Sequence, residues 1–237
     1  MTGSILVGID ASTPSRSALV WSIHRALSTG ASLELLHVVD PADADRAGAA
    51  LLLRRELQFA RTIAPDLPVI TNLADGPAED ALARRSAGHA MVVVGTHKTG
   101  FIYGQTFGSR FLELATRAHC DVAFIPDQLG STRRGVVAAA EATSAGSAVV
   151  RFAADEAAAS AQDLTLVGAT RTTATEGSVL ALAAQPALRV YSRVSGLPKA
   201  RALIAASASA SLLVVGRSGT HDVLVNMGCP VIVMCAG

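Results

Sequence analysis

The stretch Ser4–Pro14, which reads SILVGIDASTP, decides the fold of this chain. It begins as a short apolar run that ends at Asp10, as expected of a buried strand that reaches the surface. Ser12 and Pro14 then offer a capping hydroxyl and a proline suited to the first turn of a helix. The stretch therefore predicts a strand, a tight turn and a helix, and Gly30 is placed to stop that helix.

The same alternation continues through the first half of the chain. The predicted strands are Ser4–Ile9, Ser32–Val39, Val69–Leu73, Met91–Val94 and Val122–Pro126, and the helical patterns between them end near residues 28, 63, 85 and 117. Strands that alternate with helices imply right-handed crossovers and a parallel sheet with helices on both faces. We therefore predict an α/β fold.

The order of elements begins again after a short polar linker at residues 127–134. Placing Glu141 over Asp10 aligns the start of the second half with the start of the first, and later strands match as well. We predict two open parallel-sheet domains of Rossmann-like type in tandem, at residues 1–128 and 133–237.

The two copies are unequal. The segment between the last two strands is about a dozen residues shorter in the second copy, Gly216–Cys229, than in the first, Gly95–Cys120. The second helix of the second copy is predicted to shrink to about Gly177–Ala184, with Pro186 breaking it. Most of one loop and its helix are therefore expected to be missing from the second domain.

The composition fits this fold and argues against two classes of protein. Of the 237 residues, 50% are hydrophobic and 4% aromatic, so the core must be built mainly from Ala, Val, Leu and Ile. The formal net charge of +1 gives no field to attract nucleic acid. The longest charge-free runs, Ala202–Gly216 and Val223–Gly237, are shorter than the roughly 18 residues that span a membrane. We predict that the protein binds neither nucleic acid nor membrane.

The N-terminus and the cysteines predict a cytoplasmic location. No basic segment precedes the first apolar run, and Asp10 interrupts that run early, unlike a secretory signal. Cys120, Cys229 and Cys235 are an odd number in mostly apolar surroundings without CxxC spacing. We interpret them as reduced core cysteines.

Three strand ends of the first domain predict one crevice. In an open parallel sheet, ligands bind at the carboxyl ends of the strands where the connections change direction, and Asp10, Val38 and Gly95 lie at or near such ends. The loop from Gly95 to Ser109 is rich in glycine and leads into a helix, which suits a phosphate group. A merely flexible glycine loop is the alternative.

Charged and polar side chains add chemistry to this crevice. Lys98 and Arg110 can neutralise a phosphate, and the Ser109 hydroxyl can donate to it. Asp10 can accept from a ribose hydroxyl or hold a metal ion, or it can simply cap the following helix. The chain contains neither the G-x-x-x-x-G-K-[ST] nor the G-x-G-x-x-G fingerprint of nucleotide-binding proteins.

Nearly the whole chain resembles the universal stress proteins in their tandem form. In the first copy the resemblance rests on Val7–Ser12, Leu36–Asp40, Val93–Gly95, Gly108-Ser109 and Ala118–Val122. ATP-binding members of that family carry a glycine, two residues, a glycine, nine residues, a glycine and then Ser or Thr. Here Gly95, Gly108 and Ser109 take the outer positions, whereas Lys98 replaces the middle glycine, a role that Gly100 could take after a local shift.

The resemblance implies an adenine nucleotide alpha hydrolase-like fold with ATP in the first domain, and it leaves Mg²⁺ open. It implies that Asp10 meets the ribose or the nucleotide's metal and that the Val38 backbone meets adenine. The implied binding residues are Asp10, Ala11, Ser12, Val38, Gly95, His97, Lys98, Gly100, Gly108 and Ser109. His97 is alternatively an exposed loop histidine without a function.

The second domain is predicted to bind no ATP. It keeps Gly216 but has lost the last glycine, its hydroxyl neighbour and the helix start, and Glu141 would intrude on the ribose position. The resemblance implies that it pairs with the first domain through the strands Val122–Ile125 and Val231–Met234, as an intrachain pseudo-dimer. Homodimer formation is left open.

Two functions fit the sequence. The first is a cytoplasmic stress-response protein that binds an adenine nucleotide for regulation, hydrolyses it slowly at most and acts on an unidentified protein partner. The second is a nucleotide-free interaction module of the same fold. An enzyme that acts on phosphorylated metabolites is a distant third, because the same crevice would serve it.

Overall fold

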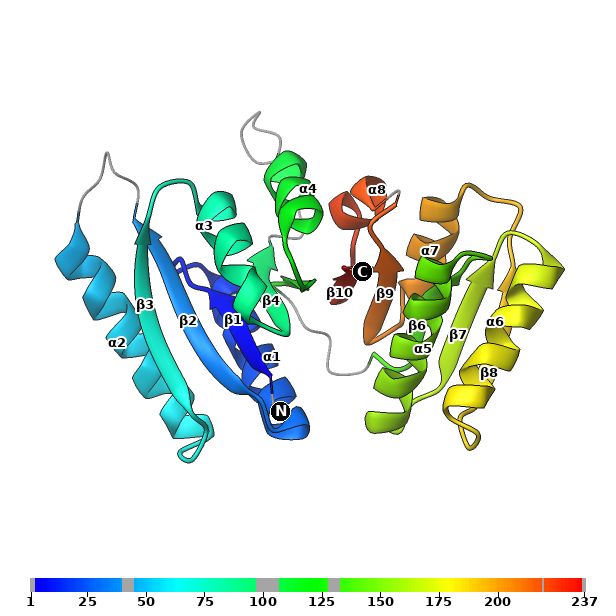
Figure 1. Ribbon diagram of the computed structural model, residues 1–237, viewed down its shortest axis with the longest axis horizontal. Coiled ribbons are helices and arrows are strands. Elements are labelled where there is room, and N and C mark those ends of the chain that lie inside the picture. The colour runs from blue at the N-terminus through cyan, green and yellow to red at the C-terminus, as the bar shows by residue number, and fades with distance from the viewer. Residues whose placement is uncertain (1–2, 40–44, 97–106, 128–132, 219, 236–237) are drawn as a thin grey trace. The chain divides into compact units, whose positions relative to one another are not determined.

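The computed structural model describes residues 3–39, 45–96, 107–127, 133–218 and 220–235, and of residues 107–111 it describes the backbone alone (Figure 1). The chain divides into two compact units, Met1–Gln128 and Leu129–Gly237. Within each unit, parallel strands alternate with helices along the chain.

The N-terminal unit is a parallel sheet covered by helices. Its strands are β1 (Ser4–Gly8), β2 (Ser32–Val39), β3 (Val69–Asp75), β4 (Met91–Thr96) and β5 (Asp121–Pro126), and their order is β3-β2-β1-β4-β5. Its helices are α1 (Thr13–Thr29), α2 (Arg46–Ile63), α3 (Ala78–Arg85), the 3-10 turn η1 (Ser86–Gly88) and α4 (Phe107–Arg117). The predicted α/β fold with parallel strands is therefore confirmed.

The order of the strands fixes where the sheet changes direction. The chain moves from β1 outward to β2 and β3 and then returns to β4 on the other side of β1. Helices α1 and α2 contact each other, as do α3 and α4, and right-handed crossovers put these two pairs on opposite faces. The reversal between β1 and β4 leaves room at their carboxyl ends.

The first helix begins and ends as the sequence predicts. The Ser12 hydroxyl caps α1 by accepting a hydrogen bond from the Ser15 N–H at 3.2 Å, and Pro14 lies in the first turn. Gly30 ends the helix with a left-handed φ of 70°, a conformation that glycine adopts without steric cost. Strand β2 has the predicted bounds.

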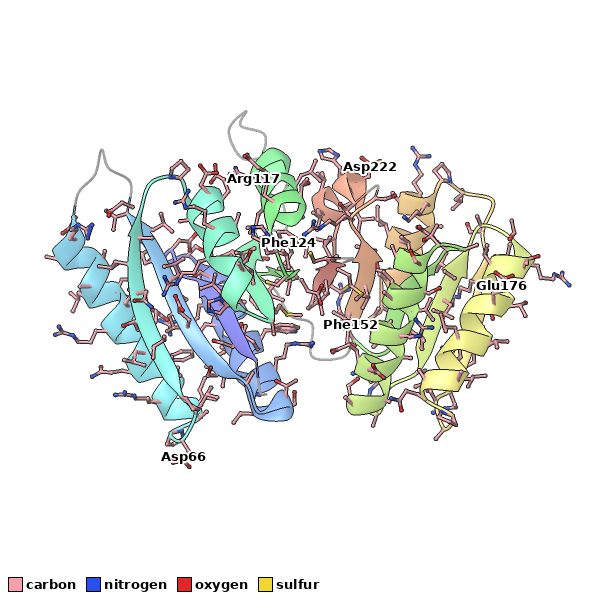
Figure 2. The ribbon with its side chains drawn as sticks, in the orientation of Figure 1. Asp66, Arg117, Phe124, Phe152, Glu176 and Asp222 are labelled. Carbon is pink, nitrogen blue, oxygen red and sulfur yellow. The ribbon has the colours of Figure 1, made fainter. Side chains whose placement is uncertain are left out.

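The core of the N-terminal unit is largely aliphatic. Leu6, Leu19, Ile23 and Val92 have no exposed surface, and the one-sided burial of α1 brings its apolar stripe onto β1 and β4. Phe124 in β5 is also fully buried (Figure 2). The composition prediction of a core rich in small aliphatic residues is thereby confirmed for this unit.

The C-terminal unit repeats the order of elements. Its strands are β6 (Val136–Ala140), β7 (Leu164–Gly168), β8 (Val190–Val194), β9 (Leu212–Gly216) and β10 (Val231–Met234), and their order is β10-β9-β6-β7-β8. Its helices are α5 (Ser144–Ala159), α6 (Arg171–Ala184), α7 (Lys199–Ser207) and α8 (His221–Val225). Helix α8 is the short remnant expected where the loop and helix are missing.

One predicted boundary in this unit is wrong. Helix α6 begins at Arg171 rather than near Gly177, because Thr170 and Thr173 form a reciprocal capping box. A threonine replaces the Glu or Gln that usually marks such a box, so the start signal is weak in the sequence. The predicted end at Ala184 is confirmed.

The register of the strands places Glu141 at the position of Asp10. Ile5 pairs with Met91 across β1 and β4, and Val136 pairs with Leu212 across β6 and β9, at equivalent points of the two sheets. Counting forward from Ile5 and from Val136, Asp10 and Glu141 each lie five residues further along the chain.

The cysteines differ in burial. All three are free thiols, and Cys229 is buried whereas Cys120 and Cys235 are partly exposed. The prediction of three core cysteines is therefore wrong for two of them. Burial raises the pKa of the Cys229 thiol to about 11, with Arg133 and a hydrogen bond with Ser207 acting the other way, so this thiol is protonated at neutral pH.

None of the helices in the described ranges combines the length and the apolar character that a membrane span requires.

Candidate functional site

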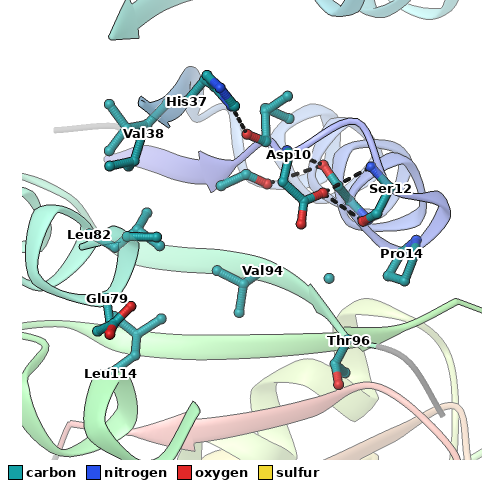
Figure 3. Close-up of a pocket in the computed structure, with 16 residues that line it drawn as sticks. Asp10, Ser12, Pro14, His37, Val38, Glu79, Leu82, Val94, Thr96 and Leu114 are labelled. Carbon is teal, nitrogen blue, oxygen red and sulfur yellow. Dashed lines mark hydrogen bonds between the residues drawn. The ribbon is translucent and has the colours of Figure 1, made fainter. Parts of the chain in front are cut away.

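A cavity of about 280 Å³ opens at the carboxyl ends of β1, β2 and β4 in the N-terminal unit (Figure 3). It lies at the point where the strand order reverses, the usual ligand position in an open α/β sheet. Its walls come from the loop after β1, the end of β2, the start of α3, the end of β4 and α4. The lining residues are Gly8, Ile9, Asp10, Ser12, Pro14, Ser15, Leu36, His37, Val38, Ala78, Glu79, Leu82, Val94, Gly95, Thr96 and Leu114.

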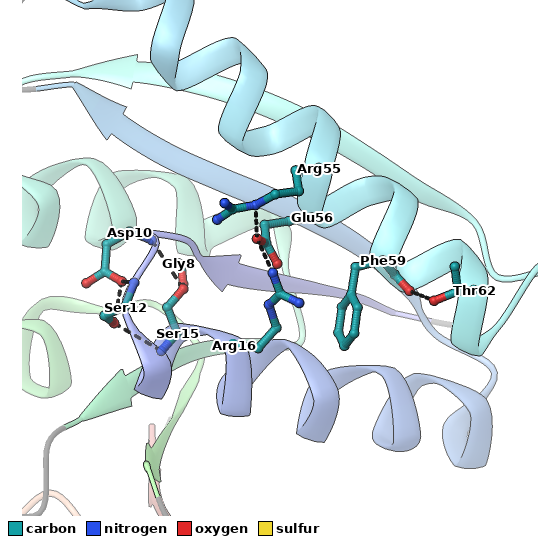
Figure 4. Close-up of polar contacts among 9 residues, drawn as sticks. All are labelled: Gly8, Asp10, Ser12, Ser15, Arg16, Arg55, Glu56, Phe59 and Thr62. Carbon is teal, nitrogen blue, oxygen red and sulfur yellow. Dashed lines mark hydrogen bonds and ion pairs between the residues drawn. The ribbon is translucent and has the colours of Figure 1, made fainter.

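A tight turn holds the Asp10 carboxylate at the edge of this cavity. Its Oδ1 accepts hydrogen bonds from the Ser12 N–H at 3.0 Å and the Ser12 hydroxyl at 2.6 Å (Figure 4). The Asp10 N–H donates to Ser15 Oγ at 3.2 Å, and Ser15 Oγ donates to the Gly8 carbonyl at 3.4 Å. The intervening Ala11 has a φ of 68°, in the left-handed region that costs a side chain roughly 1 kcal/mol. These bonds leave Oδ2 without a hydrogen-bond partner among the described residues.

The alternative prediction, that Asp10 caps α1, is wrong. The hydroxyl that caps α1 belongs to Ser12, and Asp10 instead accepts from Ser12. The carboxylate therefore stands before the helix with one oxygen committed to the turn, in a position where it can bind a second group.

His37 ties the end of β2 to β1. Its Nδ1 lies 2.6 Å from the Ile9 carbonyl oxygen, and since a carbonyl can only accept, Nδ1 carries the proton and donates it. The Ile9 N–H donates to the Leu36 carbonyl at 2.9 Å. These two bonds hold the end of β2 against the segment after β1, next to Val38.

Gly95 has a packing role besides its place in the cavity wall. A Cβ at this position would clash with backbone atoms of Pro14 and Ser15, because β4 ends directly against the first turn of α1. The absence of a side chain here is therefore required by the fold, whether or not a phosphate approaches.

The cavity has an apolar end and a polar end. Leu82 and Leu114 lie at the end near α3 and α4, with Glu79 beside them, whereas Asp10 and Ser12 lie at the other end (Figure 3). The two carboxylates are the charged groups among the described lining residues, and no lysine or arginine is among that set.

The structure brings together part of the predicted set. Asp10, Ser12, Val38 and Gly95 line the cavity, whereas Ala11 lines two other hollows instead. Gly108 and Ser109 lie in the first turn of α4, whose side chains there are not described. The predictions for His97, Lys98 and Gly100 fall outside the described residues.

Several lining residues escaped the sequence prediction. Neither His37 nor Glu79 was assigned to the site from the sequence. Both enter the site because α3 and β2 meet above the end of β1. The Gly76-Pro77 turn before α3 was the signal that could have drawn attention to Glu79, since it starts a helix at a strand's carboxyl end.

The corresponding place in the C-terminal unit is smaller and is occupied by an ion pair. A cavity of about 90 Å³ lies at the ends of β6 and β7, and Glu141 and Lys199 are among its lining residues. The Lys199 ammonium pairs with the Glu141 carboxylate and donates to the Ser218 carbonyl at 3.1 Å. Glu141 is thus already neutralised by the protein, unlike Asp10.

Metal-ligating side chains do not gather in the described part of the chain: no group of three or more His, Cys, Asp or Glu residues is placed to hold an ion there.

Comparisons with known proteins agree with this architecture. The chain is 30% identical over 164 residues to a universal stress protein of Mycobacterium tuberculosis (strain H37Rv), covering 65% of this chain and 60% of that protein. The chain therefore spans less than two thirds of that relative's length. A second universal stress protein of the same organism is 30% identical over 132 residues, or 52% of this chain and 47% of that protein.

Solved structures share the fold across the chain. A universal stress protein from Archaeoglobus fulgidus matches with a TM-score of 0.82 at 15% identity, over 99% of this chain and 97% of that chain. A functionally unknown protein from Pseudomonas aeruginosa PAO1 matches with a TM-score of 0.65 at 19% identity, over 98% and 92%. The model of the universal stress protein family matches residues 1–126. This chain belongs to the universal stress protein family.

Proposed function

We propose that the N-terminal unit binds ATP in the cavity at the ends of β1, β2 and β4, and that binding serves regulation rather than strong catalysis. The observation that carries the proposal is the convergence of Asp10, Val38 and Gly95, from the carboxyl ends of three separate strands, on one cavity at the switch point of the sheet. Family membership of this half of the chain supports the same assignment.

The polarity of the cavity suits a nucleoside. The apolar end, with Leu82, Val94 and Leu114, offers a surface on which a base can lie, and the backbone of Val38, another lining residue, would meet its edge. The polar end offers Asp10 Oδ2 to a ribose hydroxyl. The phosphates would then extend past Gly95 towards the start of α4, whose N-terminal N–H groups favour anions.

Asp10 also fits a Mg²⁺ ion that arrives with the nucleotide. Mg²⁺ prefers oxygen ligands and is commonly held by one or two carboxylates together with substrate phosphates, and Oδ2 is the oxygen that the turn leaves over. The ion would screen phosphate charge.

Hydrolysis is expected to be slow at most. Phosphoryl transfer needs a group that orients the attacking water, and the two serine hydroxyls at this end are engaged in the turn: Ser12 with Asp10, and Ser15 with Gly8. The output of the site would then be a nucleotide-dependent surface, read by a protein partner in the cytoplasm. We further propose that the C-terminal unit binds no nucleotide and pairs with the N-terminal unit through the strands Val122–Ile125 and Val231–Met234.

Calorimetric titration with Mg-ATP tests the proposal, and the two units supply a matched pair of variants. Asp10→Asn keeps the Oδ1 acceptor of the turn but removes the charge, and we expect about a tenfold weaker affinity for Mg-ATP. Glu141→Gln makes the same chemical change at the equivalent position of the other unit and should leave the affinity unchanged.

Two results would contradict the proposal. Wild-type protein that releases no heat at millimolar Mg-ATP, and that carries no nucleotide into an acid extract, would favour the nucleotide-free interaction module. Equal losses of affinity in Asp10→Asn and Glu141→Gln would show that the cavity in the N-terminal unit is not the site.

A further inference from the structure

Glu79 lies at the apolar end of the cavity without a protein partner. It occupies the first turn of α3 and lines the cavity beside Leu82 and Leu114 (Figure 3). No hydrogen bond or ion pair joins its carboxylate to another of the residues that the structure describes. The next residue, Asp80, is held by Arg117 on α4, so the two acids of this turn have different surroundings.

The charge of Glu79 fits one end of a nucleotide only. A carboxylate repels phosphate groups, so the triphosphate cannot lie against α3 and must extend the other way, past Gly95. The part of the ligand that reaches Glu79 is then the base, which also suits the leucines around it.

We propose that Glu79 selects bases that carry an exocyclic amino group, adenine above all, over bases that carry a carbonyl there. The proposal rests on the proposed nucleotide site and assigns its selectivity. An ionised carboxylate can only accept hydrogen bonds, so it accepts from the amino N–H at position 6 of adenine. The oxygen at position 6 of hypoxanthine or guanine is also an acceptor, so it leaves Glu79 unpaired and is repelled by it.

The C-terminal unit has no carboxylate at the position of Glu79. The structurally equivalent start of α7 carries Lys199, which pairs with Glu141 in the smaller cavity of about 90 Å³. The residue after it, at the place of Glu79, is Ala200. An acceptor at the start of this helix is therefore not a requirement of the fold, since α7 forms without it.

The test is a competition between ATP and ITP, which differ only in the base, measured as the ratio of their affinities. Both ligands carry the same charge, so any general effect of a variant on stability or electrostatics cancels in the ratio. We expect wild-type protein to prefer ATP, and Glu79→Gln to narrow that preference about tenfold, because an amide can accept from one base and donate to the other. Glu79→Ala should narrow it similarly, and Glu79→Asp should retain part of it.

Asp80→Asn is the control, since it removes the same charge from the same helix turn but from a group that faces Arg117. It should leave the ATP-to-ITP ratio at the wild-type value. If wild-type protein binds ATP but Glu79→Gln keeps the full preference, the selectivity role of Glu79 is wrong and the proposed site stands. If wild-type protein binds neither nucleotide, both proposals fail.

Discussion

At the residue scale, Gly95 meets two requirements at once: a place in the cavity wall and close packing against the first turn of α1. It lines the cavity as predicted for a phosphate-binding glycine, yet the backbone of Pro14 and Ser15 already forbids a Cβ there. A glycine in this motif therefore cannot be read as a sign of ligand binding alone. At its counterpart Gly216 a Cβ would lie 3.7 Å from Val149 Cγ2, which is an ordinary van der Waals distance.

This difference predicts that replacing each glycine by alanine lowers the free energy of unfolding by unequal amounts. Gly95→Ala should destabilise the protein by about 2 kcal/mol, because the clash involves backbone that cannot move without shifting α1 against β4. Gly216→Ala, the matched control, should cost less than about 0.5 kcal/mol. Urea unfolding curves of the two variants measure the difference, and equal midpoints would show that the end of β4 yields to the added methyl group.

At the element scale, a buried carboxylate joins α2 to α1. Glu56 on α2 is 3% exposed, and its Oε1 accepts from Arg16 Nη2 at 2.7 Å and from Arg55 Nε at 3.1 Å (Figure 4). The Arg16 guanidinium also lies over the Phe59 ring, 4.1 Å from its centroid. Oε2 is buried and has no hydrogen-bond partner among the described residues. The helix pair that lies behind the Asp10 turn thus depends on Arg16.

Removing Arg16 should therefore cost far more than removing a surface pair of the same kind. Arg16→Met leaves Glu56 buried with Arg55 alone, and we expect a loss of about 2 kcal/mol in the free energy of unfolding. Arg46→Met breaks the ion pair of Arg46 with Asp75, in which the two side chains are 58% and 57% exposed. This change should lower the free energy of unfolding by less than about 1 kcal/mol. Denaturant unfolding of both variants provides the measurement, and a smaller loss for Arg16→Met than for Arg46→Met would show that Glu56 is reached by water.

At the scale of the whole molecule, two units of the same strand order have unequal sites. The N-terminal cavity of about 280 Å³ keeps Asp10 Oδ2 and Glu79 available, whereas the C-terminal cavity of about 90 Å³ holds the Glu141–Lys199 pair. The same strand order therefore accommodates two cavities of different size and charge.

The asymmetry predicts one nucleotide per chain. A calorimetric titration of the full chain with Mg-ATP should reach saturation at a molar ratio of about one, and Lys199→Ala should not add a second site of comparable affinity, since the loop and helix that would hold phosphates are short there. A ratio of about two in wild-type protein would overturn the assignment of the C-terminal unit.

Local pattern was enough to predict most elements of this chain. The apolar run before Asp10, the cap at Ser12 and the stop at Gly30 each involve residues close in sequence, and the structure confirms all three. The start of α6 was predicted about six residues too far along the chain. Such signals have this limit because Thr173 completes a capping box without the usual Glu or Gln. The convergence of Asp10, Val38 and Gly95 was also predictable, since parallel strands bring their carboxyl ends to one edge.

The sequence by itself determined the α/β fold, the repeated order of elements and three of the residues that line the cavity, Asp10, Val38 and Gly95. The reason is that the hydrophobic period and the capping residues of a segment indicate its secondary structure without reference to the rest of the chain. Tertiary structure alone decided that Gly95 must be a glycine for packing, that Glu79 faces the cavity while Asp80 turns to Arg117, and that Lys199 neutralises Glu141. Each of these depends on which distant elements the strand order and the crossovers place side by side, and no local pattern carries that information.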